Sequence, residues 1–126
     1  MTAGIVDTSV LIHLFRGNSL AIAWVANQQD LSITSISWLE FMQGAPGKRG
    51  QTTCLQLMRQ FGREFLTQSD QQWAMDQMFR YRLSHGISLT DCLIASVCNR
   101  LQVALYTDNV KDFLPMLSRR LVIKPY

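Results

Sequence analysis

Several of the nine acidic residues in this 126-residue chain stand where parallel α/β proteins place their chemistry. Asp7 follows a short apolar run, and Glu40 and Asp91 lie in the first turns of two expected helices. The segment Asp108–Asp112 follows a second β-rich run near the end of the chain. Because the carboxyl ends of parallel strands and the helix starts that follow them meet at one edge of a sheet, we expect these acids to gather in one pocket.

Each of these acids also has a purely structural explanation. Ser37–Glu40 and Ser88–Asp91 resemble capping patterns, in which an acid in the first helical turn reaches back to the helix start. Asp7 fits a turn position, and Asp112 fits a helix cap. Capping explains Asp91 least well, because the apolar sequence after it implies a helix buried on most faces, which would partly desolvate the carboxylate.

A cluster of carboxylates favours a hard divalent cation. Burial and neighbouring negative charges both raise the pKa of a carboxyl group, so clustered acids are unfavourable unless a cation lies among their oxygens. The three cysteines, Cys54, Cys92 and Cys98, form no C-x-x-C pair, and only two histidines are present, which disfavours zinc. Magnesium, with manganese as a possible substitute, fits an all-oxygen ligand set and would assist attack on a phosphate.

The elements that must position these acids alternate between strands and helices. Strands are expected at Gly4–Val6, Leu31–Thr34, Val103–Tyr106 and Leu121–Ile123, and helices at Val10–Phe15, Leu20–Asn27, Ser37–Gln43, Gln51–Phe61, Asp70–Leu83 and Leu89–Leu101. Residues 44–50 are expected to form an exposed loop. This order predicts one α/β domain over residues 1–126, with a central, mostly parallel β-sheet flanked by helices.

Composition and charge restrict the functional class. With 48% hydrophobic and 17% charged residues, the chain has the composition of a globular protein. No apolar run approaches the roughly 18 residues that span a bilayer, and no basic segment precedes the first strand, so we expect a cytoplasmic protein with reduced cysteines and no membrane partner. The net charge is +3. If the acids share a pocket, the remaining surface is basic and either attracts RNA phosphates or is simply solvated. The candidate cations are Lys48, Arg49, Arg59, Arg63, Arg80, Arg82, Arg119, Arg120 and Lys124.

Four blocks, in this order, carry a resemblance to a known family. They are Ile5-Val6-Asp7-Thr8-Ser9-Val10-Leu11-Ile12, Ser37-Trp38-Leu39-Glu40, Gly86-Ile87-Ser88-Leu89-Thr90-Asp91-Cys92-Leu93-Ile94-Ala95 and Tyr106-Thr107-Asp108-Asn109-Val110-Lys111-Asp112-Phe113. Together they cover nearly the whole chain, which resembles the PIN-domain nucleases and, within them, the VapC-type toxins of type II toxin-antitoxin systems.

The resemblance implies roles for the acids. Asp7 and Asp91 would be the metal ligands, and Glu40 would complete the acidic pocket. Ser9 and Thr107 would supply hydroxyls behind the ligands. Family members often carry an acid at the position of Asn109, so the fourth group remains open between Asp108 and Asp112, and Asp112 is the one assigned a catalytic role.

The resemblance also implies a function and partners. The chain would be a magnesium- or manganese-dependent endoribonuclease that hydrolyses RNA phosphodiester bonds. It would form a homodimer, and a cognate antitoxin would block its groove with a C-terminal segment. The apolar residues Trp24, Trp38, Phe41, Met42 and Leu57 either line that groove or pack in the core.

Two other functional readings stay open. A catalytically inactive PIN-like module would bind RNA or a partner without cutting it. A phosphatase of the haloacid dehalogenase type would use Asp7 as a nucleophile, but that family has a second acid two residues later, where this chain has Ser9. RNA cleavage and its dependence on a divalent ion separate these readings.

Overall fold

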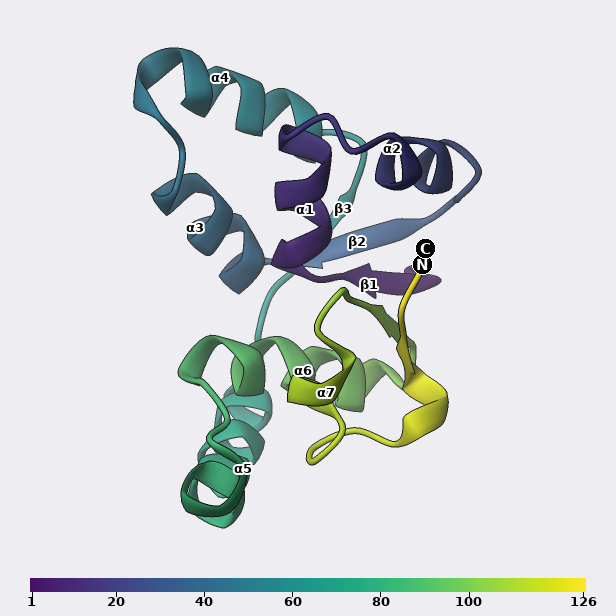
Figure 1. The fold of residues 1–126 in the computed structure, drawn as a ribbon. Coiled ribbons are helices and arrows are strands. Elements are labelled where there is room, and N and C mark those ends of the chain that lie inside the picture. The colour runs from purple at the N-terminus through teal and green to yellow at the C-terminus, as the bar shows by residue number, and fades with distance from the viewer.

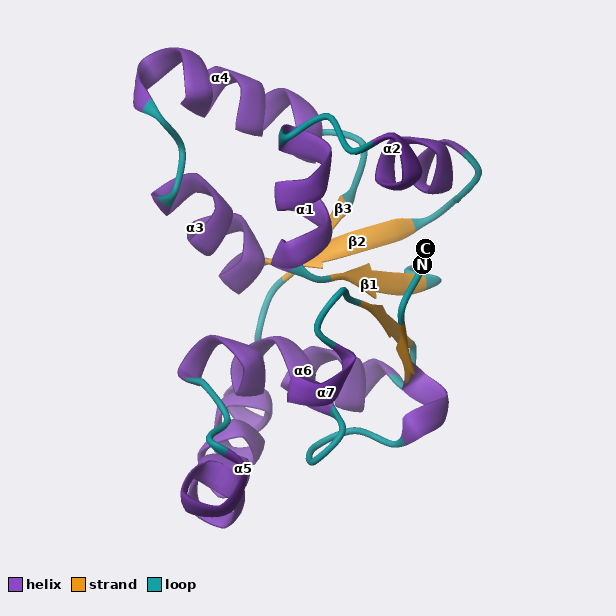
Figure 2. Ribbon diagram, viewed as in Figure 1, coloured by secondary structure: helices purple, strands orange, loops and turns teal.

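Five parallel strands form one sheet in the order β3-β2-β1-β4-β5 (Figures 1 and 2). The computed structural model describes all residues from 1 to 126. The strands are β1 (Gly4–Val6), β2 (Leu31–Thr34), β3 (Gly62–Glu64), β4 (Ala104–Tyr106) and β5 (Val122–Ile123). Every neighbouring pair is parallel, so the predicted α/β class is confirmed and the sheet is wholly parallel.

Helices cover both faces of the sheet, as Figure 1 shows. Above it in that view lie α1 (Thr8–Phe15), α2 (Ser19–Ala26), α3 (Ser35–Gln43) and α4 (Gly47–Met58), and below it lie α5 (Gln68–His85), α6 (Leu89–Leu101) and α7 (Val110–Phe113). Successive strand residues point to opposite faces. Ile5 therefore packs in the core on the α6 side of the sheet, and Val6 packs in the core on the α1 side. Neither side chain is exposed.

The order of the strands places the topological switch point of the sheet between β1 and β4. The chain builds outward from β1 through β2 to β3, and then returns to the other side of β1 to form β4 and β5. Parallel sheets bind ligands outside the carboxyl ends of their strands at such a reversal. Asp7 directly follows β1 and Thr107 directly follows β4, and the Asp7 N–H donates to the Tyr106 carbonyl at 2.9 Å. The fold thus brings two predicted site segments to its switch point.

Two short elements escaped prediction. Strand β3 contains Arg63 and Glu64 and lies at the edge of the sheet, so it lacks the buried apolar pattern that marks a strand. Helix α7 is only four residues long, too short for helical periodicity to show. Both follow from pairing and packing with distant segments, which local patterns do not encode.

Several predicted boundaries were wrong, among them the starts of α4 and α5. Residues 47–50 belong to the first turn of α4 and are not part of a loop. Helix α5 begins at Gln68, because Thr67 is its N-cap: the Thr67 Oγ1 accepts from the Asp70 N–H, and the Asp70 carboxylate accepts from the Thr67 N–H, both at 3.0 Å. This reciprocal capping box fixes the helix start two residues before the expected one.

The cysteines and the helix lengths bear on the expected environment. Cys54, Cys92 and Cys98 are all buried and unpaired, and the last two lie on α6 as predicted. No single helix has the length and apolarity to cross a membrane; α1 and α2 reach them only jointly, with a 113° bend between the two.

Candidate active site

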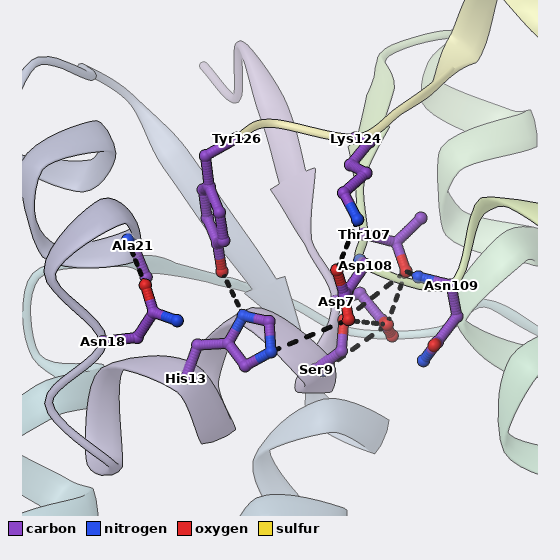
Figure 3. A network of polar contacts seen from close by, with 10 residues as sticks. All are labelled: Asp7, Ser9, His13, Asn18, Ala21, Thr107, Asp108, Asn109, Lys124 and Tyr126. Atoms are coloured by element: carbon purple, nitrogen blue, oxygen red, sulfur yellow. Dashed lines mark hydrogen bonds and ion pairs between the residues drawn. The ribbon is translucent and has the colours of Figure 1, made fainter.

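Asp7, at the switch point between β1 and β4, accepts several hydrogen bonds through its side chain. It is the N-cap of α1, and its side chain is 4% exposed. Its Oδ2 accepts hydrogen bonds from the Ser9 hydroxyl at 2.8 Å, from the Thr107 hydroxyl at 2.8 Å and from the Ser9 N–H at 3.4 Å (Figure 3). All three bonds reach one oxygen, so the carboxylate is held in a single orientation.

The two hydroxyls that hold Asp7 also fasten the loop after β4. The Asp108 N–H donates to the Ser9 Oγ at 3.1 Å, and the Asn109 N–H donates to the Thr107 Oγ1 at 2.9 Å. The Thr107 side chain is fully buried. Ser9 and Thr107 thus lie directly behind Asp7, as the sequence predicted, and link α1 to the β4 edge.

Burial and hydrogen bonding act on Asp7 in opposite directions. Removal from water disfavours the charged form and raises the pKa of the Asp7 carboxyl, and this effect is larger than the opposing effect of the hydroxyl and backbone donors. The carboxylate is therefore an oriented anion kept in an environment that disfavours its charge. A nearby cation would stabilise the charged form of such a group.

Glu40 reaches the same region from α3. Its Oε1 accepts a hydrogen bond from the Thr8 hydroxyl at 2.6 Å, and Thr8 is the residue after Asp7. Helix α3 begins at Ser35 and is capped by Thr34, whose Oγ1 accepts from the Ser37 N–H. Glu40 therefore lies in the second turn and does not cap the helix, so the capping explanation is wrong for this residue.

Asp91 begins α6 beside these acids. Ser88 is the N-cap, and its hydroxyl accepts from the Asp91 N–H at 3.1 Å, but no capping box closes from the Asp91 carboxylate. Burial raises the pKa of Asp91 from 3.8 to about 6, with further contributions from the negative charges of Asp7, Asp112 and Glu40. The carboxylates of Asp7, Asp112 and Glu40 are therefore close enough to Asp91 for their negative charges to disfavour its ionised form.

The three residues considered for the fourth site group, Asp108, Asn109 and Asp112, have different surroundings. Asp112 lies on α7 and acts electrostatically on Asp91. The Asp108 carboxylate instead pairs with Lys124 at 3.1 Å and faces His13 at 3.7 Å. Asn109 is exposed and is the N-cap position of α7, without a side-chain capping bond. The structure thus places Asp112 near Asp91, whereas the Asp108 carboxylate is paired with Lys124.

Sequence reasoning missed three residues at this edge. Thr8 holds Glu40, and its place next to Asp7 was the only signal for it. His13 was not among the predicted site residues, but its ring Nδ1 lies 2.6 Å from the Tyr126 hydroxyl and its Nε2 faces Asp108 (Figure 3). Lys124 was known only as one of the surface cations. His13 and Tyr126 are about a hundred residues apart in the chain, so no local pattern reveals their contact.

The donor set fits a hard divalent ion. No three His, Cys, Asp or Glu side chains stand close enough to share one ion as the side chains are placed. Magnesium does not require such a cage, because it is typically held by one or two carboxylates, water and phosphate oxygens. The rise in the pKa of Asp91 caused by its acidic neighbours marks an excess of negative charge that a divalent cation would offset. Asp7 and Asp91 are the oxygen donors that would hold it.

A groove of about 380 Å³ opens beside Glu40 between α1, α3 and α4. It is lined by Ile12, Phe15, Arg16, Glu40, Phe41, Gly44, Ala45, Pro46 and Cys54. Of the five apolar residues considered for such a groove, only Phe41 lines it. Trp24, for example, packs against the rings of Tyr106 and Tyr126.

Fold and pocket define a class: a parallel α/β domain that gathers carboxylates at the switch point of its sheet. The chain belongs to the PIN domain family, whose sequence model matches residues 4–113. The resemblance found in the four sequence blocks is thereby confirmed. No curated protein sequence is significantly similar to the chain.

Solved structures share this fold over most of the chain. A chain of a toxin-antitoxin complex from Klebsiella pneumoniae is 26% identical, with 98% of both chains covered and a TM-score of 0.73. A chain of VapBC2 from Rickettsia felis, solved with a promoter DNA fragment, is 16% identical, with 98% of both chains covered and a TM-score of 0.76. The sarcin-ricin loop cleaving toxin VapC20 of Mycobacterium tuberculosis is 15% identical over 88% of this chain and 94% of its own, with a TM-score of 0.69.

Proposed function

We propose that this protein is a VapC-type toxin of a type II toxin-antitoxin system, acting as a magnesium- or manganese-dependent endoribonuclease. The observation that carries the proposal is the cluster of acids at the switch point of the sheet, where burial and the negative charges of Asp7, Asp112 and Glu40 raise the pKa of Asp91. Uncompensated acids at this place are costly for folding alone. The similarity to toxins of solved complexes supports the same function.

The residues have distinct roles in the proposed mechanism. Asp7 and Asp91 would hold the ion, which when bound supplies Lewis acidity to the scissile phosphate and to the attacking water. Ser9 and Thr107 fix the Asp7 carboxylate through Oδ2 and leave Oδ1 free of these bonds. Glu40, held by Thr8, is placed to orient a water or accept its proton.

The surface outside the pocket suits a polyanionic substrate. All nine candidate cations are exposed, and all of them except Lys124, which is paired with Asp108, are candidate RNA contacts. Arg63 lies over the ring of Trp38, with 5.6 Å between its guanidinium carbon and the ring centroid. Exposed guanidinium groups bind phosphates, and their attraction to RNA weakens with salt. We therefore expect RNA binding that falls as ionic strength rises.

Cleavage of labelled RNA in the presence and absence of divalent ions tests the proposal. Wild-type protein is expected to cut RNA with magnesium or manganese and to stop when a chelator is added. Equal cutting with chelator would exclude the metal-dependent mechanism. Metal-independent binding without any cutting would instead favour the inactive PIN-like module.

Replacing Thr107 with valine is expected to lower cleavage about tenfold to a hundredfold, because the variant keeps the shape but loses the hydroxyl that orients Asp7. Thr107→Ser is the matched control, since it retains the hydroxyl. Cleavage rates at saturating metal measure the effect. Equal rates for the valine and serine variants would mean that this hydrogen bond plays no part in catalysis.

The groove beside Glu40 supports an antitoxin partner. It is mostly apolar, with Ile12, Phe15 and Phe41 among its lining residues, and it ends at an acidic side chain. An inserted segment with apolar side chains and a basic group would match this lining and block access to the acids. Co-expression with a short neighbouring open reading frame should then suppress cleavage; unchanged cleavage would exclude that product as the antitoxin.

The homodimer implied by the family remains a prediction. Met75, Phe79 and Leu83 are spaced four residues apart on α5 and are 71%, 90% and 101% exposed. Such an apolar helix face is unusual on a monomer and is compatible with self-association. A solution mass of one chain, measured by light scattering, would exclude the dimer.

A further inference from the structure

The carboxylate of Asp108 faces two side chains from distant parts of the chain, Lys124 and His13. Its Oδ1 lies 3.1 Å from the Lys124 Nζ, and its Oδ2 lies 3.7 Å from the His13 Nε2 (Figure 3). The Asp108 side chain is 35% exposed and the Lys124 side chain 58% exposed. An exposed pair of this kind contributes little to stability, about 0–1 kcal/mol. We therefore examine the effect of the pair on the position of the Asp108 side chain.

The backbone of Asp108 is part of the support of Asp7. Its N–H donates to the Ser9 hydroxyl, and that hydroxyl donates to the Asp7 Oδ2. On either side of Asp108, Thr107 donates to the same oxygen and Asn109 donates to Thr107. A displacement of Asp108 would therefore be transmitted to both hydroxyls that orient Asp7.

The segment after β5 anchors this arrangement from outside. Lys124 follows directly on β5, and Tyr126, two residues later, bonds through its hydroxyl to the Nδ1 of His13. The Tyr126 ring also packs against Trp24, with centroids 6.2 Å apart. His13 on α1 and Lys124 after β5 thus converge on Asp108 from opposite sides, as Figure 3 shows.

We propose that Lys124, assisted by the His13–Tyr126 pair, is a positioning residue that holds the negative charge of Asp108 outside the acidic pocket. Without that counter-charge, a fifth carboxylate next to the pocket is repelled by the four acids or drawn toward a bound cation. Either displacement pulls on the Asp108 N–H and loosens the Ser9 and Thr107 hydroxyls around Asp7. The effect on cleavage rests on the proposed function, whereas the effect on the loop does not.

The test compares Lys124→Met, Lys124→Arg and the double variant Lys124→Met with Asp108→Asn. Two readouts are measured: hydrogen exchange of the amides at positions 108 and 109 by NMR, and the kinetics of RNA cleavage. Lys124→Met is expected to speed amide exchange about tenfold and to lower kcat about tenfold with little change in KM, because the catalytic carboxylate is misplaced. Lys124→Arg should behave as wild type. The double variant should recover both properties, because the asparagine side chain carries no charge to be held away.

The outcomes separate the positioning role from its alternatives. Unchanged amide exchange in Lys124→Met would overturn the proposal. Faster exchange in the single and double variants alike would make the contact an ordinary surface pair and would also overturn it. A higher KM that Asp108→Asn does not restore would make Lys124 a phosphate contact instead. If wild-type protein cuts no RNA but the exchange rates follow the expected pattern, the proposed function fails and the positioning role stands.

Discussion

Replacing Asp7 with asparagine is expected to lower RNA cleavage about a thousandfold or more while leaving the protein at least as stable as wild type. Asparagine caps helices as well as aspartate does, and its carbonyl oxygen still accepts from Ser9 and Thr107. Burying a neutral amide also avoids the desolvation that raises the pKa of the Asp7 carboxyl. The substitution therefore removes the negative charge that a metal ligand needs and keeps the helix cap and the hydrogen bonds.

Asp70 provides a matched control for Asp7. It is also buried, at 2% exposure, and also serves a helix start, but it pairs with Arg100 at 3.0 Å and lies outside the pocket. Asp70→Asn should leave cleavage intact and lower the free energy of unfolding by about 1–3 kcal/mol, because it weakens a charged hydrogen-bond pair. Urea unfolding and cleavage rates check both variants. If Asp7→Asn cleaved RNA at the wild-type rate, Asp7 would have only a structural role as a helix cap.

The stability of the metal-free protein is expected to fall as pH rises from about 4 to 6, opposite to the usual behaviour of a paired acid. The pKa of Asp91 is 3.8 in the unfolded reference and about 6 in the fold, so the folded state retains a proton that the unfolded state has already lost. Well below pH 4 both states are protonated and no penalty exists. The penalty grows through this window and is complete above pH 6.

The size of this loss and its reversal can be measured by urea unfolding with a chelator present. A pKa rise from 3.8 to about 6 corresponds to about 3 kcal/mol at full strength, which partial exposure of Asp91 reduces to about 1–2 kcal/mol. Asp91→Asn should flatten the dependence, and manganese should restore stability above pH 6 in wild type only. The environment assigned to Asp91 would be contradicted if the free energy of unfolding rose between pH 4 and 6 in wild type and rose at least as much in Asp91→Asn.

Local patterns predicted the parts of the fold that depend on nearby residues. Asp7 could be placed because a buried strand and a helix start flank it directly, and Asp91 because a capping serine precedes an apolar helix. The edge strand β3 could not be predicted, because its residues become a strand only through pairing with β2. Length and apolar periodicity favour the long central elements over such short edge elements.

The candidate site shows the same division between near and distant partners. Sequence alone left Asp108 and Asp112 both open for the fourth group, with Asp112 assigned the catalytic role, since both follow β4 by a few residues. In the structure, Asp108 is paired with Lys124 and faces His13, both far away in the chain, whereas Asp112 lies near Asp91. The bond from Thr8 to Glu40 likewise spans 32 residues and brings Glu40 next to the residue that follows Asp7. Such choices are made by tertiary contacts.

Mapping manganese binding by NMR tests the central claim, that these carboxylates form one divalent metal site, most directly. Paramagnetic broadening is expected to start at the amides of Ser9, Cys92 and Glu40, and to leave the region of Asp70 unaffected. Asp7→Asn should abolish it at the same manganese concentration. Broadening centred elsewhere, or equal broadening in the Asp7→Asn variant, would contradict the account.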